Sequence, residues 1–286
     1  MQPSSVGIVV ISTFTHAYWN FLLKRARGTS TFIALSKGVE VVCFAPVFVW
    51  LVVATHGVGM NAIPLMAIGA ALVLLNYAAL AAAYAVGDLS FVYPISRAGI
   101  LLFLPTLGFL VFRERLTIIG WTSLACIVAG IAILQLRAPG STSRASGGAA
   151  LYSLAAALIA ALYTVWDKHA IQTLTPFIYF YGYTFLVALV YIATVWRRSR
   201  PGDIATVWKA HRWSIVQVGV LNTVTYLLVL LALRSGTSSY VIALRQLSIV
   251  WGALLGSFLL GESLSTPKKV ALATLVAGCV MVAFAH

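Results

Sequence analysis

The sequence predicts an all-α polytopic membrane protein with ten transmembrane helices, arranged as two inverted five-helix repeats. Of its 286 residues, 61% are hydrophobic and only 9% are charged, and the mean hydropathy is +0.98. A soluble domain carries about 25% charged residues, so this composition excludes the soluble class. Long apolar runs recur along the chain, and its two halves share residues at a constant spacing.

Each span follows from the length that an apolar helix needs to cross a bilayer. A hydrocarbon core of about 30 Å needs about 20 apolar residues, and only helices or closed barrels satisfy all backbone polar groups there. The unbroken runs exclude a barrel. Thr117 is placed to cap the fifth helix, and Ser265 and Thr266 precede Pro267 at the start of the tenth. In chain order, the spans are expected near 6–23, 32–55, 62–86, 90–112, 117–136, 149–166, 177–196, 213–233, 238–260 and 267–285.

One glycine- and serine-rich segment divides the chain into halves that resemble each other. A shift of 148 residues lays Arg97 on Arg245 and Glu114 on Glu262 without a gap. An arginine and a glutamate at the same separation rarely coincide by chance, so we interpret the halves as a duplication. We predict a first five-helix repeat at 1–137, a linker at 138–148 and a second five-helix repeat at 149–286.

Five spans per repeat is an odd number, which makes the second repeat enter the membrane from the side opposite to the first. Inverted repeats of this kind are typical of secondary transporters, whose substrate site lies near the midplane between the repeats. The first apolar run begins almost at Met1 and precedes Lys24. A signal peptide would carry its positive charge first, so we interpret this run as a retained span.

The loop charges predict the orientation. Ten of the 19 lysines and arginines belong to the loops after the odd-numbered spans, and three more near the starts of the following spans, Lys37, Lys268 and Lys269, bring this side to thirteen. The other side has only Arg113, Arg115, Lys168 and Arg234. The positive-inside rule then places the thirteen in the cytoplasm and both termini outside. The net charge of +13 is explained by this orientation and by anionic lipid, so no nucleic-acid partner is needed.

Two related signatures carry a resemblance to a known family. Residues 112–117 read FRERLT and residues 260–265 read LGESLS, and each is followed by a helix with Ala-Gly near its end. With ten spans in a five-plus-five repeat, the chain resembles the EamA-like branch of the drug/metabolite transporter superfamily. The resemblance implies a secondary transporter, often an exporter of amino acids or other small metabolites, with a central cavity. Many relatives keep both termini in the cytoplasm, the reverse of the orientation expected here.

Arg97 and Arg245 are the leading candidates for a binding site. Each lies about 10 Å below the start of its helix, on opposite sides of the midplane in an inverted repeat. Arginine stays charged and offers a planar fork to carboxylate or phosphate, so the pair can receive an anionic group in alternation. The alternative is that each arginine extends to its own interface, or binds backbone carbonyls where Pro94 breaks the helix.

Uncharged polar and aromatic residues near mid-membrane complete the candidate site. Amides at this depth either link helices or face a polar cavity, and both interpretations stay open. Hydroxyl and amide groups beside the arginines can complete the hydrogen bonds of an anion. The predicted substrate-binding residues besides the arginines are Trp19, Asn76, Tyr77, Tyr93, Ser96, Asn222, Tyr226, Gln246 and Ser248.

Glu40 is the only carboxylate well inside a predicted span, and it is the candidate for proton coupling. It follows Lys37 by three residues, so an ion pair that serves packing alone is the alternative. Asp88 and Asp167 lie at predicted helix ends, where we expect interfacial positions. The repeat-related Glu114 and Glu262 are expected to accept hydrogen bonds from the first amides of the helix that follows each.

The residues favour a proton-coupled or exchange transporter of a small polar or anionic metabolite over two other classes. A flippase for an anionic lipid-linked substrate is the alternative that arginines also permit. An enzyme is disfavoured, because no metal-binding, nucleophile or cofactor signature occurs. The expected partners are a small-molecule substrate and the bilayer, in a bacterial plasma membrane. Residues 197–212 place apolar side chains at helical spacing among basic ones, as in a surface helix.

Overall fold

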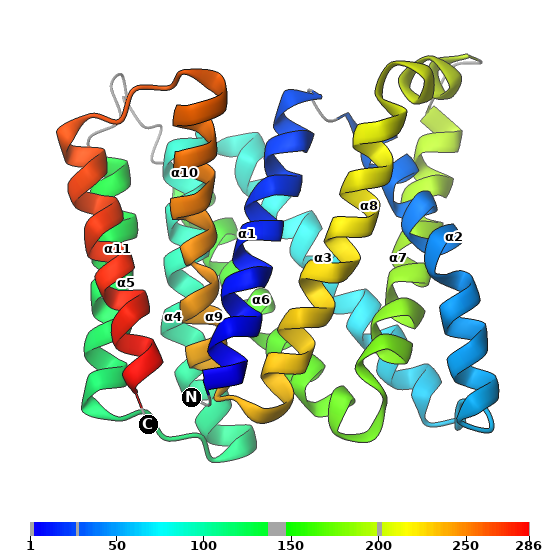
Figure 1. Ribbon diagram of the computed structural model, residues 1–286, viewed down its shortest axis with the longest axis horizontal. Coiled ribbons are helices and arrows are strands. Elements are labelled where there is room, and N and C mark those ends of the chain that lie inside the picture. The colour runs from blue at the N-terminus through cyan, green and yellow to red at the C-terminus, as the bar shows by residue number, and fades with distance from the viewer. Residues whose placement is uncertain (1–2, 27–28, 137–146, 199–201, 286) are drawn as a thin grey trace.

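The computed structural model describes residues 3–26, 29–136, 147–198 and 202–285. In this part of the chain every regular element is a helix (Figure 1). The elements are α1 (Pro3–Arg25), α2 (Ser30–Ala54), α3 (Ala62–Val86), α4 (Leu89–Phe112), α5 (Ile118–Leu136), α6 (Gly147–Thr173), α7 (Pro176–Arg198), α8 (Asp203–Ser235), α9 (Ser238–Arg245), α10 (Leu247–Leu260) and α11 (Thr266–Phe284).

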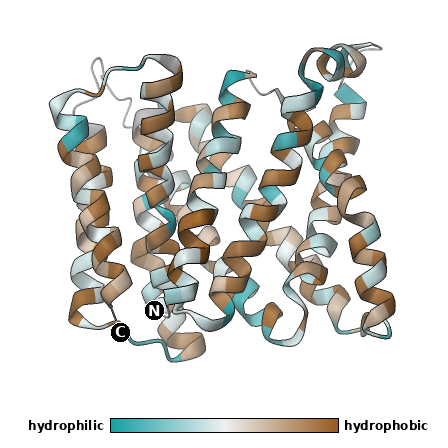
Figure 2. Cartoon of the chain, viewed as in Figure 1, coloured by the Kyte–Doolittle hydropathy of each residue, from teal (hydrophilic) through white to brown (hydrophobic). Residues whose placement is uncertain are grey.

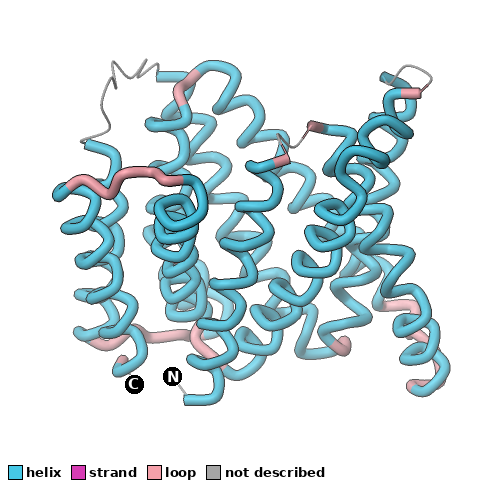
Figure 3. The backbone as a smooth tube through the Cα atoms, turned by 45° about the horizontal axis from the view of Figure 1, so that its top comes forward, coloured by secondary structure: helices cyan, strands magenta, loops and turns pink. Residues whose placement is uncertain are grey.

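Nine segments of the described chain are long and apolar enough to cross a membrane, with α9 and α10 together forming one of them. A tenth apolar helix, Ile118–Leu134 within α5, is shorter. Hydrophobic residues colour most of the length of the helices in Figure 2, and large apolar side chains such as Trp50 and Phe258 are exposed on the outside. Figure 3 shows that the loops lie at the two ends of the bundle. The chain is a multi-pass membrane protein.

Two helices extend beyond their predicted limits. The sixth continues to Thr173, well past the expected end at residue 166, because its polar residues find partners inside the protein rather than at an interface. The eighth begins at Asp203 and includes most of the predicted surface segment, which a non-helical residue, His211, separates from the rest of α8. The predicted linker at 138–148 lies, up to residue 146, outside the described residues.

The predicted helix starts have different local chemistry. Thr117 caps the fifth helix as expected, since its Oγ1 accepts a hydrogen bond of 3.2 Å from the Gly120 amide. Ser265 precedes α11 with a proline in the first turn, but its side chain makes no capping hydrogen bond. Pro267 alone therefore presets that helix start, because its fixed φ suits the first turn.

Contacts between the halves determine where a central site can form. α3 and α4 pack against α6, α1 packs against α8 and α10, and α5 packs against α11. The α5–α11 contact is close at one glycine on each helix: a Cβ on Gly130 would lie 2.9 Å from the Leu275 amide nitrogen, and one on Gly278 would lie 2.7 Å from Ile127 Cγ1. Packing of this kind needs small residues at the contact.

Both termini lie at the same end of the bundle, and α1 and α6 run in opposite directions (Figure 1). The C-terminal ends of α1 and α10 therefore lie on the side of the bundle remote from the chain termini. The C-terminal end of α4 and the start of α9 lie on the side of the chain termini. The middle of the bundle is left to α1, α3, α4, α6, α8 and α9, which position the candidate site.

Candidate functional site

A cavity of about 270 Å³ lies between the two halves of the chain. Its wall comes from α1, α3 and α4 on one side and from α6, α8 and α9 on the other. Ten of the eleven predicted substrate-binding residues line it: Trp19, Asn76, Tyr77, Tyr93, Ser96, Arg97, Asn222, Tyr226, Arg245 and Gln246. The eleventh, Ser248, lines a space of about 250 Å³ that shares Arg97 and Tyr93 with the first and reaches Lys24.

Both arginines are half-buried in the cavity wall and stack on aromatic rings. The Arg97 Cζ lies 5.3 Å from the centroid of the Tyr93 ring, and the Arg245 Cζ lies 5.7 Å from that of Tyr226. Within the described residues neither guanidinium is in an ion pair. His16 on α1 lines the same cavity. Each arginine therefore lines the cavity with its guanidinium stabilised over a tyrosine ring.

The helix break lies beside Arg245 rather than beside Pro94. α4 continues through Pro94 without interruption, whereas the ninth span is divided into α9 and α10 at Gln246, the residue after Arg245. The backbone amide of Gln246 donates a hydrogen bond of 3.1 Å to the Ala243 carbonyl, three residues earlier, whereas an α-helix would use the carbonyl four residues earlier. A tighter turn at this point re-aims the side chains that follow it.

The amides near mid-membrane link helices. Asn76 Nδ2 donates a hydrogen bond of 2.7 Å to the Ala156 carbonyl and so connects α3 to α6. Asn222 Nδ2 donates to both carboxylate oxygens of Glu40, at 3.1 and 3.2 Å, and connects α8 to α2. Two other polar atoms at the wall, Trp19 Nε1 and Gln246 Oε1, are buried without a hydrogen-bond partner in the described chain.

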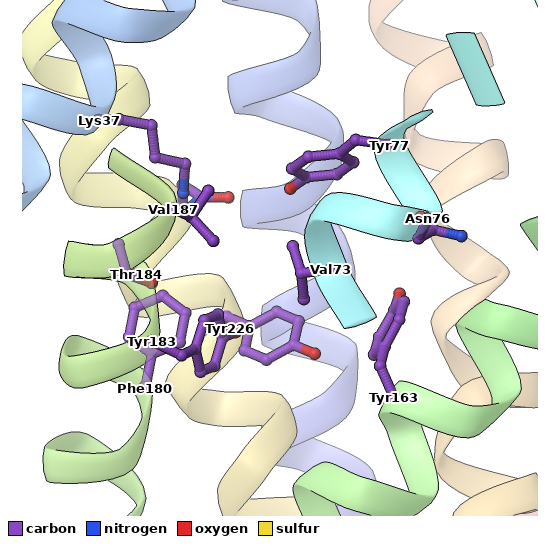
Figure 4. Close-up of a pocket in the computed structure, with 11 residues that line it drawn as sticks. Lys37, Val73, Asn76, Tyr77, Tyr163, Phe180, Tyr183, Thr184, Val187 and Tyr226 are labelled. Atoms are coloured by element: carbon purple, nitrogen blue, oxygen red, sulfur yellow. The ribbon is translucent and has the colours of Figure 1, made fainter. Parts of the chain in front are cut away.

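A smaller space of about 60 Å³ adjoins the main cavity (Figure 4). Both share Asn76, Tyr77, Tyr163, Asn222 and Tyr226. In Figure 4 the Tyr77, Tyr163 and Tyr226 rings lie around this space, and the Lys37 amine reaches it from the opposite side. The polar lining thus extends from the arginines towards α2 and α7.

Glu40 is buried with a full set of partners. The Lys37 amine donates a hydrogen bond of 2.7 Å to one carboxylate oxygen, and Thr223 Oγ1 donates one of 2.9 Å to the other. Asn222 adds its two contacts. The ion pair with Lys37 is the arrangement expected of a packing role, and proton coupling by Glu40 stays a prediction.

Asp167 does not lie at a helix end, so the expectation for its position in the helix is wrong. Its side chain is 0% exposed, in the interior of α6. The hydroxyl of Tyr179 donates to Oδ1 at 2.7 Å, and the hydroxyl of Tyr226 donates a short bond to Oδ2. The sixth helix continues past this residue because two tyrosines from α7 and α8 satisfy the carboxylate within the bundle.

Glu114 also binds elsewhere than predicted. It accepts hydrogen bonds of 3.0 Å from the backbone amide and hydroxyl of Ser238, at the start of α9, and not from the helix that follows it. The Lys168 amine lies 2.5 Å from the same carboxylate. Helix capping is the right kind of interaction, but a helix of the other half receives it.

Glu262, the residue 148 positions after Glu114, pairs with Lys24 at 2.8 Å. The amine of Lys24 donates to its carboxylate and holds the pKa of Glu262 below its usual range. The side chains of this pair are 66% and 44% exposed, compared with 13% and 7% for Lys168 and Glu114. The two ion pairs thus have the same chemistry and opposite exposure.

Comparisons with known proteins identify the family. The model of the EamA-like transporter family matches residues 147–284, the second half of the chain. Through this half, the chain belongs to the EamA-like transporter family. A solved structure described as "Crystal structure of protein" is similar over 99% of this chain and 98% of its own, with 14% identity and a TM-score of 0.79. That likeness extends the shared fold to both halves. No curated protein matches.

In this membrane transporter, sequence reasoning missed part of the cavity wall. The sequence assigns no binding role to His16, Tyr84, Tyr163 or Thr225, although all four line the cavity. Helical spacing was the available signal for Thr225, because residues three or four apart share a helix face and Thr225 follows Asn222 by three. The described residues contain no cluster of three or more metal-ligating side chains.

Proposed function

We propose that the chain is a secondary active transporter of a small polar or anionic metabolite, of the amino acid or organic anion class, acting as an exporter or exchanger. The carrying observation is the cavity between the two halves, which holds Arg97 and Arg245 without counter-ions in the described chain. A charge inside a membrane costs at least about 2.5 kcal/mol. An anionic substrate that enters the cavity offsets this cost for both arginines.

The substrate site is assigned to the predicted residues that line the cavity. The arginine forks bind a carboxylate or phosphate of the substrate. The hydroxyl of Ser96 and the rings of Tyr77 and Tyr226 provide further polar and aromatic contacts. The Nε2 of Gln246 donates a hydrogen bond of 3.2 Å to the Ile242 carbonyl, so the Oε1 of the same side chain is left to accept one from the substrate. A substrate with an N–H or O–H donor beside its anionic group suits this combination.

The transport cycle is proposed to be alternating access by two inverted five-helix repeats. Repeat-related positions support this arrangement. A Cβ on Gly108 would lie 2.6 Å from Glu114 Oε2, and one on Gly256, 148 residues later, would lie 2.8 Å from Glu262 Oε2. Arg113 and Gly261 are likewise 148 residues apart and both have positive φ. The two halves thus end their fourth spans with the same backbone turn.

The two ion pairs are proposed as the closures of the opposite ends. Glu114 and Lys168 close the end near the termini, where both side chains are buried. Lys24 and Glu262 stand at the other end, where the pair is exposed and a cavity reaches Lys24. With the positive-inside rule, the accessible end faces the cytoplasm and both termini lie outside the plasma membrane.

The proposal is tested by binding and transport of defined anions. Purified protein is screened for thermal stabilisation by L-glutamate, lactate and inorganic phosphate, because a ligand of the native state raises the melting temperature. Transport of the stabilising anion is then measured in vesicles. We expect Arg97→Ala and Arg245→Ala to abolish both signals and the exposed Arg234→Ala to retain them. Wild-type transport by the double variant Arg97→Ala/Arg245→Ala would dismiss the site.

A further inference from the structure

We infer that Asp167 is a proton-binding site of this transporter and that its protonation is linked to occupation of Arg245 by an anion. The inference builds on the proposed function and gives the coupling role to a residue of the second half, whereas the sequence suggested Glu40. It rests on three features of Asp167: complete burial, the absence of a contacting cation in the described chain, and a hydrogen bond to the cavity wall.

Asp167 differs from the other carboxylates whose partners are known. Glu40, Glu114 and Glu262 each contact a lysine. In the described part of the chain, no nitrogen of a lysine, arginine or histidine lies within ion-pair distance of Asp167, which is held by two neutral hydroxyls. A buried carboxylate without a contacting cation is costly to keep charged, and taking up a proton removes that cost. A paired carboxylate has no comparable reason to exchange its proton.

Tyr226 joins Asp167 to the cavity. Its hydroxyl bonds the carboxylate, and its ring forms part of the cavity wall under the Arg245 guanidinium. Tyr179 bonds the other carboxylate oxygen, and its hydroxyl lies against Gly69 of α3, where an added Cβ would clash with it. One oxygen of the proposed proton site is therefore bonded to a tyrosine packed against α3, and the other to a tyrosine of the cavity wall.

The charges around Asp167 set the direction of the linkage. The Arg245 Cζ lies 5.7 Å from the centroid of the Tyr226 ring, and the hydroxyl of Tyr226 bonds Asp167. A positive charge this near favours the ionised form of a carboxylate. An anion bound to Arg245 offsets that positive charge, so the carboxylate then takes up a proton more readily. The anion and the proton bind together, and by reciprocity a lower pH strengthens anion binding. The other titratable or charged groups facing this site are Tyr163 on α6, Tyr179 and Tyr183 on α7, and Tyr226 on α8.

A measurement without substrate tests the proton site directly. Infrared difference spectra of the purified full chain, recorded across a pH titration, report the C=O stretch of a buried protonated carboxyl group. We expect a titrating band in the wild type and in Glu40→Gln, and its loss in Asp167→Asn.

Tyr226→Phe keeps the carboxyl group but removes one hydrogen bond, so it should shift the pH at which the band titrates. Melting temperatures and size-exclusion profiles verify that each variant is folded.

Two results would overturn the inference: persistence of the band in Asp167→Asn, or its loss in Glu40→Gln.

The linkage is tested with whichever of L-glutamate, lactate and inorganic phosphate stabilises the protein most. One linked proton changes the apparent Kd by up to about tenfold per pH unit. We expect this dependence in the wild type and a flatter profile in Asp167→Asn. An unchanged profile in Asp167→Asn refutes the linkage while transport stands, and a failure of all three anions refutes the proposed function while the infrared result still decides the proton site.

Discussion

The two ends of the bundle carry the same lysine–glutamate pair in opposite states. Near the termini, Lys168 and Glu114 are buried, and the carboxylate also receives the first amide of α9. At the other end, Lys24 and Glu262 meet in solvent and make no such contact with a helix start. Breaking a buried ion pair costs several kcal/mol of stability, whereas breaking a solvent-exposed pair changes stability by about 1 kcal/mol or less. The same ion-pair chemistry is therefore buried at one end of the bundle and exposed at the other, the difference on which the proposed closure of one end depends.

Residues around the pairs differ between the ends. The Tyr240 hydroxyl oxygen accepts a hydrogen bond of 3.0 Å from the Thr117 backbone amide and lies 3.4 Å from the Thr117 hydroxyl. The residue 148 positions before Tyr240 is Val92, which has no hydroxyl. Under the proposed repeat arrangement, this additional contact favours closure at the end near the termini. We therefore expect differences in side chains between related positions to determine which end is closed at rest.

Removing the buried carboxylate should have the largest effect. Glu114→Gln leaves the Lys168 ammonium buried without a counter-ion, which costs about 3 to 5 kcal/mol. The matched variant Glu262→Gln breaks the exposed pair and should cost about 1 kcal/mol or less. Thermal unfolding in detergent measures both, and transport in vesicles should fall more for Glu114→Gln. Equal losses at the two ends would contradict the asymmetry.

A smaller effect is expected from Tyr240→Phe. This variant removes the hydroxyl from the Thr117 amide and keeps the ring, so it should cost about 1 kcal/mol. Weakening this end should also raise the labelling of Asn20→Cys by an impermeant thiol reagent added on the side of the termini. Asn20 is an exposed residue that lines the cavity. Labelling from the opposite side serves as the control, and an unchanged ratio of the two rates would count against a closing role for Tyr240.

The sequence predicts most of this fold because apolar runs determine the spans. The third span, Ala62–Val86, has the predicted bounds, and most others differ by a few residues. Most of the cavity lining is also predictable, since polar side chains such as Asn76 and Arg245 are rare in apolar helices and need a polar environment. The constant spacing between the halves also relates Glu114 to Glu262 from the sequence alone.

Long-range partners are what the sequence does not reveal. Asp167 ends an apolar run, so hydropathy places it at an interface, yet Tyr226, 59 residues later, satisfies it inside the bundle. The amide that Glu114 caps belongs to Ser238, 124 residues away. Neither partner follows from local propensity, because both depend on how α6, α8 and α9 pack. Buried polar residues are located by sequence, but their roles come from tertiary contacts.

The smallest expected effect concerns pH at the exposed pair. The pKa of Glu262 is below its usual range because Lys24 donates to its carboxylate. A lowered folded-state pKa contributes stability that is present above the unfolded-state pKa and is lost as the pH falls through the folded-state value. The wild type should therefore exceed Glu262→Gln in melting temperature near neutral pH by a small margin, and this margin should vanish in acid. Solvent screens the pair, so high salt should remove the margin at neutral pH too. A margin that survives both acid and salt would mean that Glu262 acts through packing, and the exposed end would then resemble the buried one.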